Sequence, residues 1–242
     1  MQFIIVIAFV SLMIGLSKGG LGAVVVAGIT PVLTLIMPVQ EAVVVVIPML
    51  LIGDAIAMWM YWGAWEIRYV KLLLPMAVVG IVVGTYFLTS LPDSTLRHIL
   101  GAFTLLVVGY KLVVDRIQSI SYEPRNWHGY LAGAASGFGS ALANTGAPPF
   151  TSYMLLQNLN PRVFIGTTTL FFALVNIVKL FVQGTLIDVP RVLSIAWAIP
   201  IIPIGAWLGR KLILRLNQRT FEWMMMIALV WIGLMLLLSS PN

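Results

Sequence analysis

The residues of this chain that are best suited to bind a small ligand lie in two glycine-rich stretches within apolar sequence. The first, Gly15–Gly22, reads GLSKGGLG and places Lys18 among four glycines. The second, Gly137–Pro149, reads GFGSALANTGAPP and ends in two prolines. Clustered glycines and prolines destabilise a helix, and broken backbone at membrane depth is tolerated only where it is buried in protein or lines a wet cavity. The two stretches are therefore predicted to be facing halves of one binding site.

The chemistry of the first stretch favours an anionic ligand. A half-helix that begins at about Gly20 directs its free N–H groups and the positive end of its dipole toward Lys18. Gly19 and Gly20 allow an anion to approach this backbone closely. The alternative is that the chain turns in the outer headgroup region, where Lys18 extends into water.

The second stretch is predicted to contribute mainly polar side chains. Pro148 and Pro149 suit the first turn of a helix, but they remove two backbone N–H donors. The predicted ligand-binding groups come from Ser140, Asn144, Thr145 and Gly146. The alternative is that Asn144 and Thr145 only cap the helix that follows.

Further polar residues lie inside long apolar segments. Asp54 and Asn176 are 122 residues apart, and Lys179 lies three residues beyond Asn176 on the same helical face. In antiparallel helices, Asp54 and Lys179 are expected to be about 15 Å apart in depth, so Lys18 is the predicted ion-pair partner of Asp54. The alternative is that Asp54 is a satisfied buried carboxyl that fixes helix packing.

The elements that position these residues are predicted to be membrane helices. The chain has 242 residues, of which 60% are hydrophobic and 9% are charged, whereas roughly a quarter of the residues of a soluble domain are charged. Apolar runs of about 20 residues recur along the whole length, which predicts an all-α, polytopic protein in the lipid bilayer. The absence of cysteine excludes disulfides. The net charge of +6 is attributed to cytoplasmic loops, and no nucleic-acid partner is expected.

The order of the segments indicates an internal duplication. Ten apolar segments follow the pattern short, short, long, long, long twice, and landmarks such as Gly15 and Gly137 recur at offsets of 122 to 125 residues. Internal repeats of this kind are typical of secondary transporters. The predicted units are residues 1–125 and 126–242, each with short broken or hairpin helices at its start. Whether these short helices cross the membrane fully or are re-entrant stays open.

The charge distribution favours inverted repeats over parallel ones. If each pair of short segments enters and returns on one side, ten of the counted basic residues lie on one face and two, Arg97 and Arg191, on the other. Parallel repeats would give six on each face. By the positive-inside rule, the face with ten is cytoplasmic, and both termini are outside. The ten residues are Arg68, Lys71, Lys111, Arg116, Arg125, Arg162, Arg210, Lys211, Arg215 and Arg219.

A set of motifs along the chain resembles one known family. These motifs are GLSKGGLG with Pro31 after it, PVQEAV, GAWEIR, SLPDSTLR and, in the second half, TGAPPF. The chain is similar to the sulfite exporter TauE/SafE family, also called the toluene sulfonate uptake permease family, over essentially its whole length. The resemblance implies a transporter of sulfur-containing or other organic anions in a bacterial inner membrane. The chain departs from the family pattern at Lys18, which replaces part of a glycine-rich run and leaves the substrate open.

Together, the residues and the resemblance favour a secondary transporter or exporter of a small anion such as sulfite or a sulfonate. It would work by alternating access around a midplane site between the two broken hairpins. No catalytic residue, metal ligand or cofactor is assigned. SKGG lacks the GK[ST] ending of a nucleotide-binding loop, so ATP-driven transport by this chain is not expected. Two alternatives stay open, a non-transporting membrane assembly factor and an intramembrane hydrolase. The direction of transport, the coupling ion and a homodimeric assembly are also left open.

Overall fold

A computed structural model describes residues 2–21, 23–114, 125–157, 159–213 and 218–238. Every regular element in these residues is helical, so the prediction of an all-α protein is confirmed for them. The elements in chain order are α1 (Gln2–Leu16), the π-helix η1 (Ser17–Leu21), α2 (Ala23–Ala27), α3 (Ile29–Leu33), α4 (Val39–Val45), α5 (Ile47–Met60), α6 (Ile67–Ser90), α7 (Asp93–Val114), α8 (Asn126–Ala143), α9 (Ala147–Leu155), α10 (Pro161–Val182), the 3₁₀-helix η2 (Gly184–Leu186), α11 (Val189–Ile195), the 3₁₀-helix η3 (Ala196–Ala198), α12 (Ile201–Ile213) and α13 (Gln218–Leu238).

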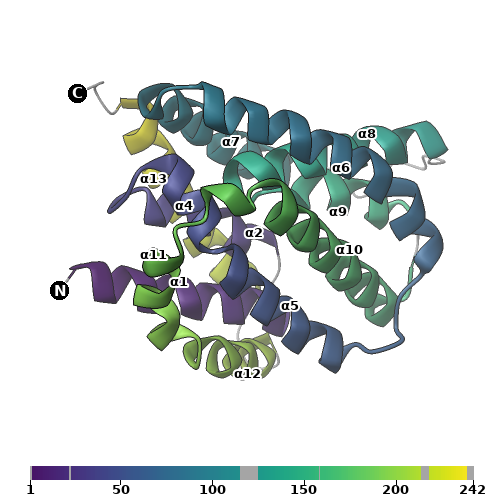
Figure 1. The fold of residues 1–242 in the computed structure, drawn as a ribbon. Coiled ribbons are helices and arrows are strands. Elements are labelled where there is room, and N and C mark those ends of the chain that lie inside the picture. Colours follow the sequence, from purple (N-terminus) through teal and green to yellow (C-terminus); the bar gives the residue numbers. More distant parts are fainter. Residues whose placement is uncertain (1, 22, 115–124, 158, 214–217, 239–242) are drawn as a thin grey trace.

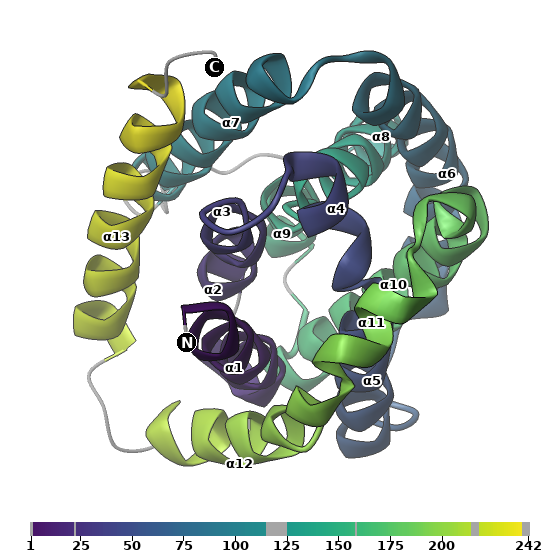
Figure 2. The same ribbon diagram turned by 60° about the vertical axis from the view of Figure 1, so that its left-hand side comes forward.

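Long helices from both halves of the chain surround a central group of mostly shorter segments. In Figure 2, α13, α7, α6, α10, α11 and α12 lie around the outside, while α1, α2, α3, α4 and α9 lie within. Figure 1 shows that α1 begins and α13 ends at the same end of the molecule. α1 leads into the first glycine-rich stretch and the second stretch ends in α9, so both reach the inside of the helical ring.

The described helices are long and apolar enough for several membrane crossings. Four helical runs pass this test, and a fifth does so if the bent α11–α12 pair is one span. The four runs are Gln2–Gly19, Val39–Met60, Ile67–Ser90 and Pro161–Val182. Large apolar side chains such as Val82 on α6 and Trp207 on α12 are more than half exposed, as a lipid-facing surface requires. The chain is therefore a multi-pass membrane protein.

The first glycine-rich stretch changes the type of helix where the sequence predicts a break. α1 continues into the π-helix η1, so the apolar run extends to Gly19 and reaches 18 residues. A short, broken helix is expected here, and whether it crosses the membrane is left open; the structure instead joins α1 and η1 in one continuous helical run. The physical reason is that a single π-helical turn widens the backbone without ending the hydrogen-bonded run.

Two long predicted segments are each interrupted. The apolar segment over residues 41–63 consists of α4 and α5, with the break at Val46, two residues before Pro48. The segment expected over residues 192–211 consists of α11, η3 and α12 and bends by 49° before α12, which follows Pro200. Proline lacks a backbone N–H and clashes with the preceding turn, so both interruptions follow from proline positions.

Two helix crossings are formed by glycines that allow backbones to touch. A methyl group built on Gly15 of α1 would overlap the backbone carbonyl of Ile202 in α12, and one on Gly137 of α8 would overlap that of Ala77 in α6. In each case a helix from one half of the chain runs parallel to a helix from the other half. Small residues at such crossings bring membrane helices close enough for extensive van der Waals contact.

Two other helix pairs from the two halves run antiparallel. In the α5–α10 pair, Asp54 bonds Asn176, while Ala64, four residues after the end of α5, lies against Gly166. In the α7–α13 pair, Gly101 lies against Leu236, while Leu105, one turn later in α7, lies against Gly233, one turn earlier in α13. Residue numbers rise along one helix as they fall along the other, which fixes the antiparallel direction of both pairs.

Candidate functional site

An ion pair inside the ring joins the first glycine-rich stretch to α5. The ammonium of Lys18 in η1 donates to Oδ1 of Asp54, and the Asp54 side chain is only 2% exposed. The second carboxylate oxygen accepts a 2.7 Å hydrogen bond from Nδ2 of Asn176 in α10. The predicted pairing of Lys18 with Asp54 is therefore confirmed. It gives Asp54 a charged partner and a neutral donor, so the buried carboxylate is satisfied on both oxygens.

A second lysine lies deeper and has a neutral partner. Lys179 in α10 is fully buried, and its ammonium donates to Oδ1 of Asn144. The Asn144 amide nitrogen in turn donates to Oγ1 of Thr30 at 3.0 Å and to the carbonyl of Val43 at 3.1 Å. Asn144 thus connects α10 with α3 and α4, which belong to the other half of the chain. We name Lys18, Asp54, Asn176, Lys179 and Asn144 the central polar cluster.

The separation of about 15 Å expected between Asp54 and Lys179 is not observed. Asn176 bonds Asp54 directly, and Lys179 follows Asn176 by a single helical turn, which is a rise of about 4.5 Å. Asp54 also acts electrostatically on Lys179. The expected separation assumes an uninterrupted helix over residues 41–63, whereas this segment is divided at Val46 into α4 and α5.

The second glycine-rich stretch is a tight turn between α8 and α9. Asn144 has φ 56°, in the left-handed region that asparagine tolerates, and ends α8 with its own N–H bonded to the Ser140 carbonyl. Pro148 stands in the first turn of α9, as predicted. No side chain caps the N-terminus of α9. The alternative that Asn144 and Thr145 cap the following helix is therefore wrong, because Asn144 is turned toward Lys179.

The other predicted residues of this turn bond or pack against α8. Thr145 donates from its backbone N–H to the Gly139 carbonyl at 3.1 Å, and its hydroxyl lies 3.4 Å from the same oxygen. Ser140 is buried, with its side chain beside Gly146. The Gly146 carbonyl accepts a 2.6 Å bond from the hydroxyl of Ser136, which the sequence did not single out. These residues stabilise the turn that directs Asn144 toward Lys179. Direct contact with substrate stays a prediction for Ser140, Thr145 and Gly146.

Of the two glycines predicted to bind an anion in the first stretch, Gly19 has an observed packing role. A methyl group on Gly19 would overlap the Ala206 carbonyl in α12, so Gly19 contributes to the helix crossing. Gly20 lies in η1, and its distance from Gly146 stays a prediction. Anion contact by either glycine is likewise untested.

Sequence reasoning missed three polar groups that complete the surroundings of Lys179. Thr30 and Gln183 are fully buried, and Thr30 accepts from Asn144. Gln183 donates from its amide to Oγ1 of Thr85 and to the Ala141 carbonyl. A signal for Gln183 was present, since it follows Lys179 by four residues and so shares its helical face. No sequence pattern marks Thr30 or the Val43 carbonyl as part of the site, because only the tertiary fold brings them to Asn144.

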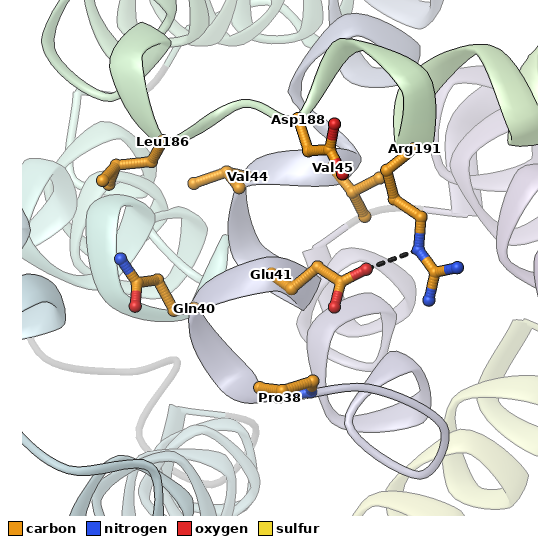
Figure 3. A pocket seen from close by; sticks show the side chains of 8 residues that line it. All are labelled: Pro38, Gln40, Glu41, Val44, Val45, Leu186, Asp188 and Arg191. Atoms are coloured by element: carbon orange, nitrogen blue, oxygen red, sulfur yellow. Dashed lines mark hydrogen bonds and ion pairs between the residues drawn. The ribbon is translucent and has the colours of Figure 1, made fainter.

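A cavity of about 230 Å³ lies apart from the central polar cluster, at the start of α4 (Figure 3). Glu41 and Arg191 line it and form an ion pair whose side chains are about one-third exposed. Val44 also lines the cavity, and the adjacent carbonyl of Val43 accepts the hydrogen bond from Asn144. A single turn of α4 therefore separates this cavity from the buried cluster.

The arrangement is suited to binding charge. With both lysines protonated, the central polar cluster holds two positive charges and one negative charge, and Asp54 is already occupied by Lys18 and Asn176. Lys179 has three N–H donors and one described acceptor, the neutral Asn144. A buried charge of this kind is costly unless it is paired, so a small anion is the chemical complement of the site.

The family model described as sulfite exporter TauE/SafE matches residues 4–236. No curated protein and no solved structure matches the chain.

Proposed function

Since the chain belongs to the TauE/SafE sulfite exporter family, we propose that it is a secondary transporter that carries a small anion, sulfite or a sulfonate, across the bacterial inner membrane. Family members are transporters rather than enzymes. In this proposal the substrate binds at the central polar cluster, and the protein exposes that cluster to the two sides of the membrane in turn.

The observation that carries the proposal is a fully buried lysine whose described hydrogen-bond acceptor is neutral. Lys18 is compensated by Asp54, whereas Lys179 is fully buried beside the neutral amide of Asn144. Intramembrane charges of this type usually mark substrate or ion pathways. We therefore assign the main anion contact to Lys179. Lys18 keeps a supporting role, because its charge is shared with the carboxylate.

We also propose that residues 1–125 and 126–242 are inverted repeats. Support comes from the α5–α10 and α7–α13 pairs, each of which joins corresponding helices of the two halves in antiparallel directions. A two-fold axis that exchanges the halves must then lie across these helices, in the plane of the membrane. The same exchange converts the α1–α12 crossing into the α8–α6 crossing. Asp54 and Asn176 would face each other at this axis, which is where inverted-repeat transporters bind substrate.

Reconstitution into liposomes tests the proposed function. We expect purified protein to move sulfite and methanesulfonate, and we expect Lys179→Gln to weaken anion binding roughly 10- to 100-fold, since charge-assisted contacts are worth about 1.5–3 kcal/mol. Gln retains an N–H donor for Asn144, so folding should survive. Phe181→Ala is the control in the same helix, because this residue is 80% exposed. If wild-type liposomes show no flux of either anion, the transporter proposal is wrong and a non-transporting membrane factor takes its place.

A further inference from the structure

Gln183 carries a buried acceptor without a partner. Its side chain is fully buried, and its amide oxygen Oε1 has no hydrogen bond among the described residues. The amide nitrogen, by contrast, donates to Oγ1 of Thr85 at 3.0 Å and to the Ala141 carbonyl at 3.1 Å. An unmade hydrogen bond of a buried acceptor costs about 1–3 kcal/mol. The orphaned oxygen therefore indicates that a donor from outside the protein completes this site.

The orientation of the amide follows from its surroundings. The Ala141 carbonyl can only accept a hydrogen bond, so the nitrogen of Gln183 must face it. If the amide were flipped, two acceptor oxygens would face each other. The amide oxygen of Gln183 must then point away from the Ala141 carbonyl, where it requires a hydrogen-bond donor.

Gln183 and Lys179 reach the same part of the fold. They are four residues apart, one turn along α10 and its C-terminal cap, and thus share one helical face. Lys179 bonds the side chain of Asn144, and Gln183 bonds the carbonyl of Ala141, three residues earlier in the last turn of α8. A ligand at this turn meets an ammonium that needs acceptors and an amide oxygen that needs a donor.

We propose that the site recognises a monoanion that carries its own proton donor, with hydrogensulfite as the simplest example. This inference rests on the proposed function and specifies the form of the substrate. A bare oxygen of hydrogensulfite accepts from Lys179, and its proton is donated to Oε1 of Gln183. The sulfite dianion lacks that proton and would place a second negative charge beside an acceptor. Methanesulfonate carries one charge but has no donor for Gln183.

The charge balance of the site agrees with a monoanion. The central polar cluster has one net positive charge when both lysines are protonated. The titratable groups that face the site are Lys179 itself, Asp54 from α5 and, beyond Asp54, Lys18 from η1. The contacts from α6, α8 and the turn after α8 are Thr85, Ala141 and Asn144, which do not titrate near neutral pH. A single added negative charge therefore neutralises the cluster.

Equilibrium binding of sulfite and methanesulfonate to the wild-type protein, measured by calorimetry from pH 5.5 to 8.5, tests the proposal. The hydrogensulfite fraction falls as pH rises past neutrality, so affinity per total sulfite should fall about tenfold per pH unit once the dianion predominates. Methanesulfonate keeps its charge throughout and reports any titration of the protein. We expect sulfite to bind more tightly at low pH and its affinity relative to methanesulfonate to fall as pH rises. Identical pH profiles for the two anions would overturn the inference while leaving the transporter proposal intact.

The variant Gln183→Met provides a second measurement. It removes the acceptor at similar volume, and we expect hydrogensulfite affinity to fall roughly tenfold, to the level of methanesulfonate, while methanesulfonate affinity changes less than twofold. Equal losses for both anions would show a merely structural role and overturn the inference. If the variant does not fold, the wild-type pH profiles decide alone. Failure of the wild-type protein to bind either anion at any pH would overturn the proposed function and this inference with it.

Discussion

Lys18 is partly buried and Lys179 is fully buried, and the two lysines differ in the charge of their partners. Lys18 pairs with the carboxylate of Asp54 and keeps 14% of its side chain exposed. Lys179 has no exposure and bonds the neutral amide of Asn144. A lysine that is paired with a carboxylate chiefly stabilises the fold, whereas one beside an amide has charge available for a ligand. The two lysines should therefore respond differently to neutral substitution.

The substitution Lys18→Met should destabilise the protein, because it leaves Asp54 buried with only Asn176 as a partner. Breaking a buried pair costs about 3–5 kcal/mol, which corresponds to a melting temperature lower by roughly 6 °C or more. The double variant Lys18→Met/Asp54→Asn removes the stranded charge and should recover most of the loss. Thermal unfolding in detergent, followed by tryptophan fluorescence, checks both variants. A single variant as stable as wild type would show that the pair is not buried in the protein.

At the scale of the elements, close backbone contact sets the positions of the central segments. α1 lies on α12 through Gly15 and Gly19, and α8 lies on α6 through Gly133 and Gly137. α1 and α8 lead directly into η1 and the Asn144 turn, so their depth determines where Lys18 and Asn144 lie. Added volume at either crossing should therefore disturb both stability and binding.

The substitution Gly137→Ala tests this dependence, because the new methyl group would overlap the Ala77 carbonyl. Overpacking of this kind costs about 1–3 kcal/mol, and the forced shift of α8 should also weaken anion binding. The control is Gly109→Ala in α7, where nothing lies within 4 Å of the added methyl group and where the loss of a helical glycine is favourable by about 1 kcal/mol. Melting temperatures should fall for the first variant and hold or rise for the second. Equal melting temperatures would contradict the proposed importance of the crossing.

At the scale of the whole molecule, charge is distributed unequally between the two ends. One end carries Arg97 and Arg191 together with Asp93, Glu41 and Asp188, so acids outnumber bases among these described residues. The other end joins the starts of α6, α8 and α10 and the end of α12, which carry basic residues with Glu66 nearby. These basic residues are Arg68, Lys71, Arg125, Arg162, Arg210 and Lys211. Arg116 and Arg215, and the side chains of Lys111 and Arg219, lie outside the described residues.

From the positive-inside rule, we propose that the basic end lies in the cytoplasm and that both termini lie outside. The chain lacks cysteine, so single cysteines can report the orientation without background. Trp62→Cys lies at the basic end and Val189→Cys at the other, and the two native side chains are 71% and 61% exposed. An impermeant maleimide should label only position 189 in intact cells and position 62 only after permeabilisation. The reverse pattern would contradict the proposed orientation.

Composition and local pattern determined the class of this protein and part of its site. Long apolar runs have no favourable place except in a bilayer, and backbone hydrogen bonding in that environment requires helices. Pro148 was predictable in the first turn of α9, because proline needs no N–H partner there. The pairing of Lys18 with Asp54 was predictable too, since a buried carboxylate requires a cation and Lys18 was the nearest candidate in depth.

The tertiary structure alone decided which polar groups surround Lys179. From the sequence, Asn144 was equally consistent with ligand binding and with capping of the next helix. In the structure its left-handed backbone turns the side chain toward Lys179 in α10. Thr30 and Gln183 reach this region from segments more than 150 residues apart in the chain. Local sequence encodes helix and turn preferences, whereas contacts between residues of distant segments depend on the depth and tilt of the helices that carry them. Those depend on interruptions such as the π-helix at Ser17–Leu21 and the break at Val46, whose geometry is set by packing against distant helices.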